Sequence, residues 1–468
     1  MTPAARLAAS IEALDAILSE GRPADGVLSA FFRSRRFIGS KDRTDIAGRV
    51  YAVLRHRARL GRLLARAGWK EASADTSTAI ARAWAFGHAV IGEGRTTDQL
   101  VTLLDGGDRY APAGLSDGER GLFDRLAAGG DYTDQTLSVA DRTECPDWAW
   151  PSFEAIYGDS AEAELAALTE EAPFDLRVNE AKGDRTVVLD ALTRDGLAVT
   201  PTPLSPLGIR VVGRPPLAGH PLFKAGVFEV QDEGSQLVAL LADPQPGHQV
   251  VDFCAGAGGK ALGLAARMAG KGRVVACDVS EGRLARAKER IRRAGIDNIE
   301  PKLLNGERDR WVKRQKRKFD RVLIDAPCTG TGAWRRNPDS RWRPVDLAEV
   351  TDLQARIVES AARLTKPGGR LIYATCSLLA AENEAQIDRL LAADPEFDVI
   401  PVASLWPETA RTDPPRDLAD SPYLRLTPHR HGTDGFFVAV LRRRPDVAAP
   451  VPAPDAEATA SDAGEGDR

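Results

Sequence analysis

The stretch that decides the fold is VVDFCAGAGGKALG, residues 250–263. A run of apolar, strand-forming residues leads into a glycine-rich turn, and a helix-forming run begins near Lys260. Such a turn lets backbone N–H groups and the helix N-terminus approach a ligand closely. Gly256, Gly258 and Ala261 match the dinucleotide-binding pattern G-x-G-x-x-G/A, although so short a pattern also recurs by chance. A P-loop is excluded, because Ala261 stands where that motif requires Ser or Thr.

This turn lies in a long segment in which strand-like and helix-like runs alternate. Within residues 246–443 the runs QVVDF, RVVACD, IEPKLL, FDRVLIDAP, GRLIYATC and GFFVAVL have the composition of strands. The alternation predicts a mainly parallel, doubly wound α/β sheet of the Rossmann-like type. Residues 1–142 have apolar residues at helical spacing, which predicts an all-helical domain. Residues 143–245 mix short strands with a helix and predict a small α+β subdomain.

Composition and charge limit the class of protein. The chain has 468 residues and a formal net charge of −4. Residues 444–468 are rich in Ala, Pro and acids, which predicts a disordered acidic tail. From Pro445 onward this tail carries a net −5, which leaves +1 on the rest of the chain, so local basic patches matter more than the total. Apolar runs long enough for a membrane helix are absent, and acids within the N-terminal amphipathic pattern argue against a signal peptide.

The five cysteines form neither a CxxC pair nor a cluster with histidine. We therefore expect no metal site, and an odd, scattered set of thiols fits a reducing cytoplasm better than a disulfide framework. The expected protein is a cytoplasmic monomer.

An acid ends the second strand of the alternating segment. Asp278 follows Gly258 by twenty residues, and a carboxylate there can accept hydrogen bonds from both hydroxyls of a ribose. NAD and S-adenosylmethionine both contain a ribose. Asp252, just before the turn, would repel a pyrophosphate, whereas a cationic sulfonium tolerates it. The acids therefore favour S-adenosylmethionine over NAD.

Two cysteines follow two later strands, Cys328 in DAPC and Cys376 in YATCS. Neighbouring strands of such a sheet would bring both thiols to one rim, near the glycine turn and Asp325. A single strand-end cysteine is usually inert, but two beside an acid and a ligand loop favour catalysis.

Methylation at carbon 5 of a pyrimidine needs this set of groups. Carbon 5 is a poor nucleophile until a thiolate adds at carbon 6, after which a base must remove the carbon 5 proton. Asp325 would stabilise the adduct near ring N3, and Lys260 or a helix N-terminus would lower the pKa of the attacking thiol. The residues alone do not decide which thiol attacks.

Four motifs in order, FCAGAGGK, DAPCTGTGAWRRNPDSRW, YATCSLLAAENEAQI and DGFF, together resemble the Sun family of RNA cytosine-5 methyltransferases. The resemblance covers about residues 225–442. It implies a Rossmann-like class I methyltransferase domain, an N-terminal NusB-like RNA-binding domain and an RRM-like α+β subdomain. It also implies S-adenosylmethionine as cofactor and 5-methylcytosine in 16S ribosomal RNA as product, with transfer RNA as the alternative substrate.

The resemblance also implies roles for single residues. Cys376, in the T-C-S motif, would be the nucleophile, Cys328 would assist release of the product, and Asp325 would hold the cytosine, with Lys260 beside them. The cofactor would be bound by the residues of the glycine turn and by the acids and amide that follow the strands, namely Cys254, Ala255, Gly256, Ala257, Gly258, Gly259, Lys260, Asp278, Asn305 and Asp325. Two positions depart from the family pattern: Ala257 replaces a proline, and Asn305 replaces an acid.

A basic stretch with interleaved tryptophans, RRNPDSRWR, follows Cys328. Bases that bind phosphates and aromatic rings that stack on nucleobases are what single-stranded RNA recognition needs. We therefore predict RNA contacts from the charged and aromatic members of this stretch, Arg335, Arg336, Arg341, Trp342 and Arg343. A cytosine must leave its stack to reach two thiols, which predicts an unpaired or flipped target.

Two other classes share part of this pattern. An NAD-dependent oxidoreductase would have the glycine turn and Asp278, but it has no need of two rim cysteines. A non-catalytic RNA-binding factor would keep the basic stretches, but it has no need of both thiols.

Overall fold

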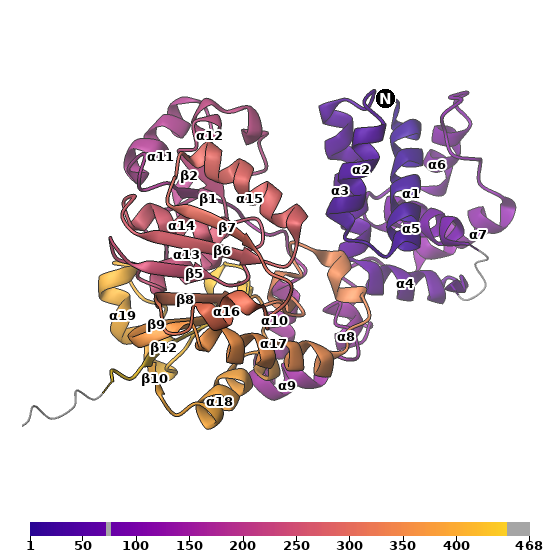
Figure 1. Ribbon diagram of the computed structural model, residues 1–468. Coiled ribbons are helices and arrows are strands. Elements are labelled where there is room, and N and C mark those ends of the chain that lie inside the picture. The colour runs from indigo at the N-terminus through magenta and orange to yellow at the C-terminus, as the bar shows by residue number, and fades with distance from the viewer. Residues whose placement is uncertain (72–75, 447–468) are drawn as a thin grey trace, which may run out of the picture.

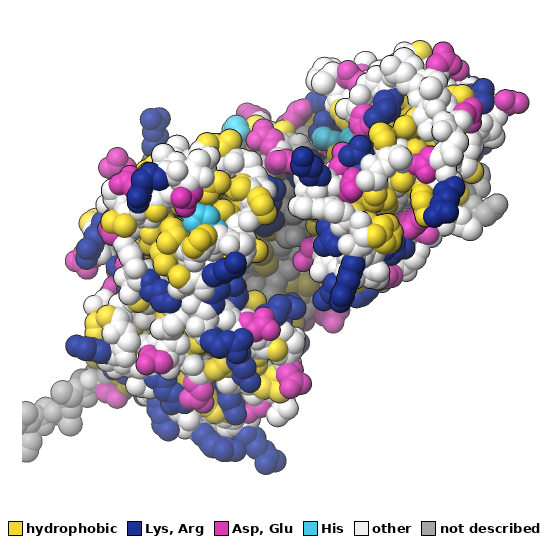
Figure 2. Space-filling model, turned by 90° about the horizontal axis from the view of Figure 1, so that it is seen from above, with side chains coloured by type: hydrophobic (Ala, Val, Ile, Leu, Met, Phe, Trp, Pro, Cys, Tyr) yellow, Lys and Arg dark blue, Asp and Glu magenta, His cyan; other side chains and the backbone are white. Residues whose placement is uncertain are grey.

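The computed structural model describes residues 1–71 and 76–446. A helical N-terminal body lies beside a larger body that contains two sheets (Figure 1). Seen from above, a deep hollow separates the two bodies, and Lys and Arg side chains lie along its rims (Figure 2).

In the described residues 1–71 and 76–142, the secondary structure of the N-terminal body consists of helices. Their apolar faces meet in one core around Trp84, Phe86 and Phe123, which are fully or almost fully buried. Side-chain caps fix several starts, including a capping box between Ser116 and Glu119. The helices are α1 (Pro3–Glu20), α2 (Ala24–Ser34), α3 (Ser40–Arg55), α4 (Arg57–Arg66), α5 (Ser77–Ile91), α6 (Thr97–Leu104), α7 (Asp117–Ala128) and α8 (Val139–Arg142).

Two further helices, α9 (Trp150–Tyr157) and α10 (Ala161–Ala167), connect the two bodies. They form a separate apolar cluster with Trp334, whose ring stacks on Phe153 with centroids 5.9 Å apart. The connector therefore packs on the loop that follows Cys328, and it lies within residues 143–245, for which the sequence predicted an α+β subdomain.

The smaller sheet is antiparallel, with strand order β2-β3-β1-β4. Phe228 and Ile209 lie in its core, beneath the helices. Its elements are β1 (Phe174–Val178), α11 (Arg185–Arg194), β2 (Val199–Pro201), β3 (Gly208–Val211), α12 (Pro221–Lys224) and β4 (Phe228–Val230).

The larger sheet has eight strands in the order β10-β12-β9-β8-β5-β6-β7, with β11 paired to β12. Strands β7, β6, β5, β8 and β9 are parallel, and β12 runs antiparallel to β9. The strands are β5 (Gln249–Asp252), β6 (Arg273–Asp278), β7 (Ile299–Leu303), β8 (Phe319–Asp325), β9 (Thr365–Thr375), β10 (Phe397–Ile400), β11 (Leu424–Leu426) and β12 (Phe436–Arg443).

Helices cover both faces of this sheet. Val250 packs with one face and Val251 with the other, as the period of two in a strand requires. One face is covered by α13 (Glu233–Leu241), α14 (Gly259–Arg267) and α19 (Val402–Thr409), and the other by α16 (Arg310–Arg314), α17 (Leu347–Ala362) and α18 (Glu384–Ala393). The remaining α-helices of this body are α15 (Glu281–Ala294) and the short α20 (Pro428–His431).

The predicted Rossmann-like doubly wound sheet with a small α+β subdomain is therefore confirmed. The chain runs from β5 outward to β7 and then returns to β8 on the other side of β5, which makes the β5–β8 boundary the topological switch point. No helix in the described ranges is both long and apolar enough to cross a membrane. The predicted disorder of the acidic tail falls on residues 447–468, outside the described residues.

Candidate active site

The glycine turn lies at the switch point, between the end of β5 and the start of α14. Gly256 and Gly258 have φ values of 56° and 79°, in the left-handed region that favours glycine. A Cβ on Gly258 would come within 3.1 Å of the Ala287 Cβ, whereas a Cβ on Gly256 would project into open space. The turn is thus packed against the protein on one side and presents its backbone on the other.

Asp278 at the end of β6 fixes this turn. Its carboxylate accepts hydrogen bonds from the N–H of Gly256 at 2.8 Å and from the N–H of Ser280 at 2.7 Å. Asn305, which follows β7, is exposed, and its amide donates to Asp309 Oδ2 at 3.1 Å. The amide is therefore oriented by a carboxylate at this position.

Three charged groups meet where β5 and β8 end. Lys260 Nζ donates to Asp325 Oδ2 at 2.6 Å. Burial alone would lower the pKa of Lys260, but the charge and hydrogen bond of Asp325 raise it above its usual value. Asp252 is fully buried, and neither of its carboxylate oxygens has a hydrogen-bond partner within residues 1–71 and 76–446. Burial, and then the charge of Asp325, raise the pKa of Asp252 to about 7.

The two predicted thiols lie together, with Cys328 Sγ and Cys376 Sγ 3.5 Å apart. Strands β8 and β9 pair in parallel with Asp325 opposite Ala374, so both thiols come from adjacent strand ends. The sulfur–sulfur contact, burial and the charges of Cys376 and Glu382 raise the pKa of Cys328 well above its usual value. Burial also raises the pKa of Cys254, beside the glycine turn, well above its usual value.

Glu382 is a site residue that the sequence did not single out. It is fully buried, and its carboxylate accepts hydrogen bonds from both of the cysteine-bearing segments. A glutamate in AAENEA, at the start of a helix, is more often a solvated first-turn acid. Only its place inside a motif that also holds Cys376 could have drawn attention to it.

The basic stretch after Cys328 is used mainly inside the protein. Arg335 and Arg341 are buried, and Arg341 donates to the carbonyl oxygens of Thr143, Glu144 and Leu168. Arg335 donates to Asp434 Oδ1 at 2.9 Å. The guanidinium groups of Arg335 and Arg341 therefore hold the fold together, which argues against the predicted contact of these two residues with RNA.

The other three residues of that prediction are partly exposed. Arg336 pairs with Asp434 Oδ2 at 2.7 Å, and Arg343 pairs with Asp339. The ring of Trp342 lies under the Arg57 guanidinium, 5.3 Å from its centroid. RNA contact by Arg336, Trp342 and Arg343 stays a prediction.

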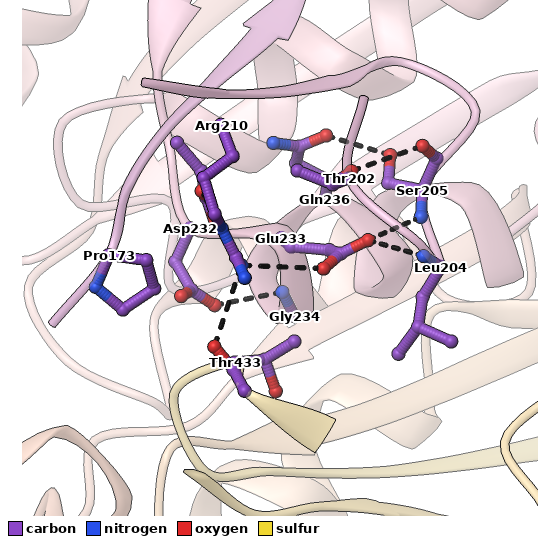
Figure 3. Close-up of polar contacts among 12 residues, drawn as sticks. Pro173, Thr202, Leu204, Ser205, Arg210, Asp232, Glu233, Gly234, Gln236 and Thr433 are labelled. Atoms are coloured by element: carbon purple, nitrogen blue, oxygen red, sulfur yellow. Dashed lines mark hydrogen bonds and ion pairs between the residues drawn. The ribbon is translucent and has the colours of Figure 1, made fainter. Parts of the chain in front are cut away.

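A buried polar junction joins the small sheet to the segment before β12 (Figure 3). Glu233 accepts from the N–H groups of Leu204 and Ser205 at 2.5 and 2.7 Å, and Arg210 of β3 lies 3.7 Å from it. Asp232 accepts from the N–H of Gly234 and, at 3.1 Å, from the N–H of Asp434. The junction fixes the Asp434 loop, which in turn holds Arg335 and Arg336.

Comparison with known proteins finds one family that matches the region of the larger sheet and another that matches the region of the smaller sheet. The family described as 16S rRNA methyltransferase RsmB/F matches residues 239–442, and the ferredoxin-like domain of RsmF/B-like methyltransferases matches residues 145–217. The probable ribosomal RNA small subunit methyltransferase B of Synechocystis is 34% identical over 314 residues, which cover 66% of this chain and 69% of that protein. The protein of the same description from Bacillus subtilis is 32% identical, with the same coverage.

Solved structures similar to this chain include a methyltransferase homologue, which agrees with the family match. The crystal structure of PH0851 is 27% identical, with a TM-score of 0.75, and covers 95% of this chain and 99% of that one. A methyltransferase homologue from Pyrococcus horikoshii is also 27% identical, with a TM-score of 0.56 over 66% of this chain and 99% of that one.

The residues present suit the cofactor of this family, S-adenosylmethionine. The open side of Gly256, the α14 N-terminus and acids rather than bases at the strand ends fit a ligand that carries a sulfonium and an amino-acid group. No group of three or more potential metal ligands occurs in the described parts of the chain. The family match favours a methyltransferase over the two alternatives, an NAD-dependent oxidoreductase and a non-catalytic RNA-binding factor. The chain belongs to the RsmB/F family of 16S ribosomal RNA methyltransferases and is an S-adenosylmethionine-dependent RNA methyltransferase.

Proposed function

We propose that this protein methylates carbon 5 of a cytosine in 16S ribosomal RNA, through a covalent bond between Cys376 and carbon 6 of the base. The observation that carries the proposal is the pair of thiols, 3.5 Å apart, beside the Lys260–Asp325 ion pair. A methyltransferase that acts on a nucleophilic nitrogen or oxygen has no use for two thiols at this place.

The chemistry proceeds in two halves. The Cys376 thiolate forms a bond to carbon 6, and the electrons of the carbon 5–carbon 6 double bond make carbon 5 nucleophilic. When bound, S-adenosylmethionine supplies the methyl group to carbon 5. A base in the site then takes the carbon 5 proton, the double bond forms again, and the sulfur–carbon bond breaks with its electron pair returning to Cys376.

The two thiols are assigned by their surroundings and by the family resemblance. Cys328 has a pKa raised well above its usual value, so at neutral pH it is a thiol and a poor nucleophile. The family resemblance gives the attacking role to the thiol of the T-C-S motif, which is Cys376 in this chain. Cys376 is therefore proposed as the nucleophile, and Cys328 as the group that assists release.

Asp325 is proposed to hold the cytosine ring. Its side chain is 32% exposed, whereas that of its partner Lys260 is 10% exposed, so the free carboxylate edge remains open toward the substrate. A hydrogen bond there to the N3 side of the ring would stabilise the adduct. The hydrogen bond from Lys260 Nζ orients the Asp325 carboxylate.

The substrate is proposed from the relatives, which are named for ribosomal RNA of the small subunit. A ribosomal substrate places the protein in the cytoplasm, and a monomer remains the expected state. Both cysteines are partly buried, so the target cytosine must be unpaired or flipped out to reach them.

Bisulfite sequencing of total RNA tests the proposal. RNA from cells with and without the gene should differ at one or a few cytosines of 16S ribosomal RNA, protected only when the gene is present. A difference confined to transfer RNA would support the alternative substrate instead. No difference in any RNA, with purified protein that still transfers methyl groups, would contradict methylation at carbon 5.

A further inference from the structure

Both cysteines are followed by a residue that donates to the same carboxylate. Thr329, directly after Cys328, donates its N–H to Glu382 Oε1 at 2.8 Å and its hydroxyl to Glu382 Oε2 at 2.5 Å. Ser377, directly after Cys376, donates its hydroxyl to Glu382 Oε2. One side chain thus joins the two segments whose thiols must meet the substrate together.

The same carboxylate is held from a third direction. Gln354 of α17 donates from its amide to Glu382 Oε1 at 3.0 Å and to the carbonyl oxygen of Pro327 at 2.9 Å. Tyr373 of β9 donates its hydroxyl to the Glu382 backbone carbonyl at 2.6 Å. Helix, strand end and cysteine loop are therefore fixed to one another through this glutamate.

Burial of the Glu382 carboxylate is energetically unfavourable unless its hydrogen bonds compensate for the lost hydration. Glu382 is fully buried, and the four donors to its carboxylate are neutral groups, two hydroxyls, one amide and one backbone N–H. Burial of a charge without an opposite charge is unfavourable, but hydrogen bonds to an ionised acceptor are shorter and stronger than neutral ones. An apolar residue would pack at this place without that cost, which points to a role in the geometry of the thiols.

We propose that Glu382 is the positioning residue that holds Cys328 and Cys376 in register for the two halves of the reaction. This inference rests on the proposed function, since it needs both thiols to act on one base. Glu382 is also among the causes that raise the pKa of Cys328. Glu382 touches neither thiol, so it acts through Thr329 and Ser377.

The test compares Glu382→Gln with Glu384→Gln. Glu384 lies two residues on, in the same sequence motif, and pairs with Arg425 instead of the cysteine segments. Purified full-length proteins would be assayed for methyl transfer to 16S ribosomal RNA, with kcat and the KM for S-adenosylmethionine measured separately. We expect Glu382→Gln to lower kcat about 10- to 100-fold, as for other displaced catalytic groups, and to leave KM within about twofold. Glu384→Gln should match the wild type.

A second pair of variants tests the Thr329 hydroxyl, which donates to Glu382 and also lies 3.5 Å from the Ser377 hydroxyl. Thr329→Val should lower kcat in the same direction, and Thr329→Ser, which keeps the hydroxyl, should restore it. These variants decide the question if Glu382→Gln fails to fold. A wild-type kcat in Glu382→Gln, or equal values for Thr329→Val and Thr329→Ser, would overturn the positioning role while 5-methylcytosine is still formed. If the wild-type protein forms no 5-methylcytosine, the proposed function itself fails. That outcome is distinguishable from failure of the positioning role alone, in which the wild-type protein still forms 5-methylcytosine.

Discussion

At the scale of single residues, the site combines two thiols of different character with acids that are buried to different degrees. Asp325 is paired and partly exposed, Asp278 is committed to backbone N–H groups, and Asp252 is buried without a partner among the described residues. Each lies at a strand end, but only the burial and partners decide which acid holds a turn and which can face a substrate. The raised pKa of Asp252 therefore depends on its burial in the fold as well as on the neighbouring Asp325 of the site.

Asp252→Asn should change how stability depends on pH. The folded protein holds a proton on Asp252 up to about pH 7, whereas an unfolded aspartate releases it near its ordinary pKa of about 3.9. The stability that this proton contributes is fully present below about pH 3.9, the pKa of an unfolded aspartate, and it is lost as the pH rises from there to about 7. Asparagine does not titrate, so the Tm of Asp252→Asn minus that of the wild type should increase between pH 5 and pH 8.

The matched control is Asp297→Asn, at an exposed aspartate on the surface. Its Tm should follow that of the wild type across the same pH range. A difference between Asp252→Asn and the wild type that is constant with pH would contradict the assignment.

At the scale of elements, the cysteine loop is positioned by backbone contacts that leave no room for a side chain. Gly332 donates its N–H to the Cys376 carbonyl oxygen at 2.9 Å, and Gly435 donates its N–H to the Gly332 carbonyl oxygen at 2.8 Å. The loop after β8 therefore lies between the end of β9 and the start of β12 and is hydrogen-bonded to both. This close approach explains the small residues in both the TGTG and the DGFF motifs.

Gly332→Ala should displace the Cys328 loop. Its Cβ would come within 2.5 Å of the Gly435 carbonyl oxygen, which is backbone and cannot rotate away. Methyl transfer should fall by about tenfold or more, because a shift near 1 Å in a catalytic group has that order of cost. Gly282→Ala, on α15, meets no atom within 4 Å and should leave the rate unchanged. A wild-type rate for Gly332→Ala would show that the loop tolerates the shift.

At the scale of the whole molecule, the partly buried Arg55 and the buried Arg341 join the helical body to the methyltransferase domain. Arg55 of α3 donates to the carbonyl oxygens of Glu170 and Arg335 at 2.7 and 2.9 Å, and Arg341 reaches the connector on the other side. Such contacts orient the N-terminal body beside the hollow seen in Figure 2. The position of that body relative to the thiols is thus set by side chains from both the helical body and the catalytic domain.

Arg341→Met should destabilise the protein without weakening the electrostatic part of RNA binding. Three buried carbonyl oxygens would lose their donor, at about 1–3 kcal/mol for a buried group left unpaired. Thermal unfolding should show a lower Tm, whereas Arg343→Met, which removes a partly exposed ion pair, should cost about 1 kcal/mol or less.

The salt dependence of RNA affinity separates a structural role from phosphate contact. Loss of a phosphate contact lowers the slope of log K against log salt by about 0.7 to 0.9. Arg341→Met should leave that slope unchanged. A reduced slope would show that Arg341 binds RNA after all.

Much of this architecture could be predicted because it depends on local patterns. The alternation of strands and helices gave the parallel sheet, and the order of β5 and β8 then required Gly256, Asp325 and both cysteines to share one edge. The roles of Arg341 and Glu382 could not be predicted, because their partners are carbonyl oxygens and hydroxyls far away in sequence or on another element. Charge in a loop suggests exposure, and only the packed fold shows where it is buried.

The most direct test of the central claim is a search for a covalent protein–RNA adduct in cysteine variants. Cys328→Ala, incubated with S-adenosylmethionine and 16S ribosomal RNA, should accumulate an adduct that survives denaturing electrophoresis, because carbon 6 is attacked but release is blocked. Cys376→Ala should form no adduct and no methylated product. An adduct with Cys376→Ala and none with Cys328→Ala would reverse the roles, and the absence of an adduct in both variants would contradict covalent catalysis.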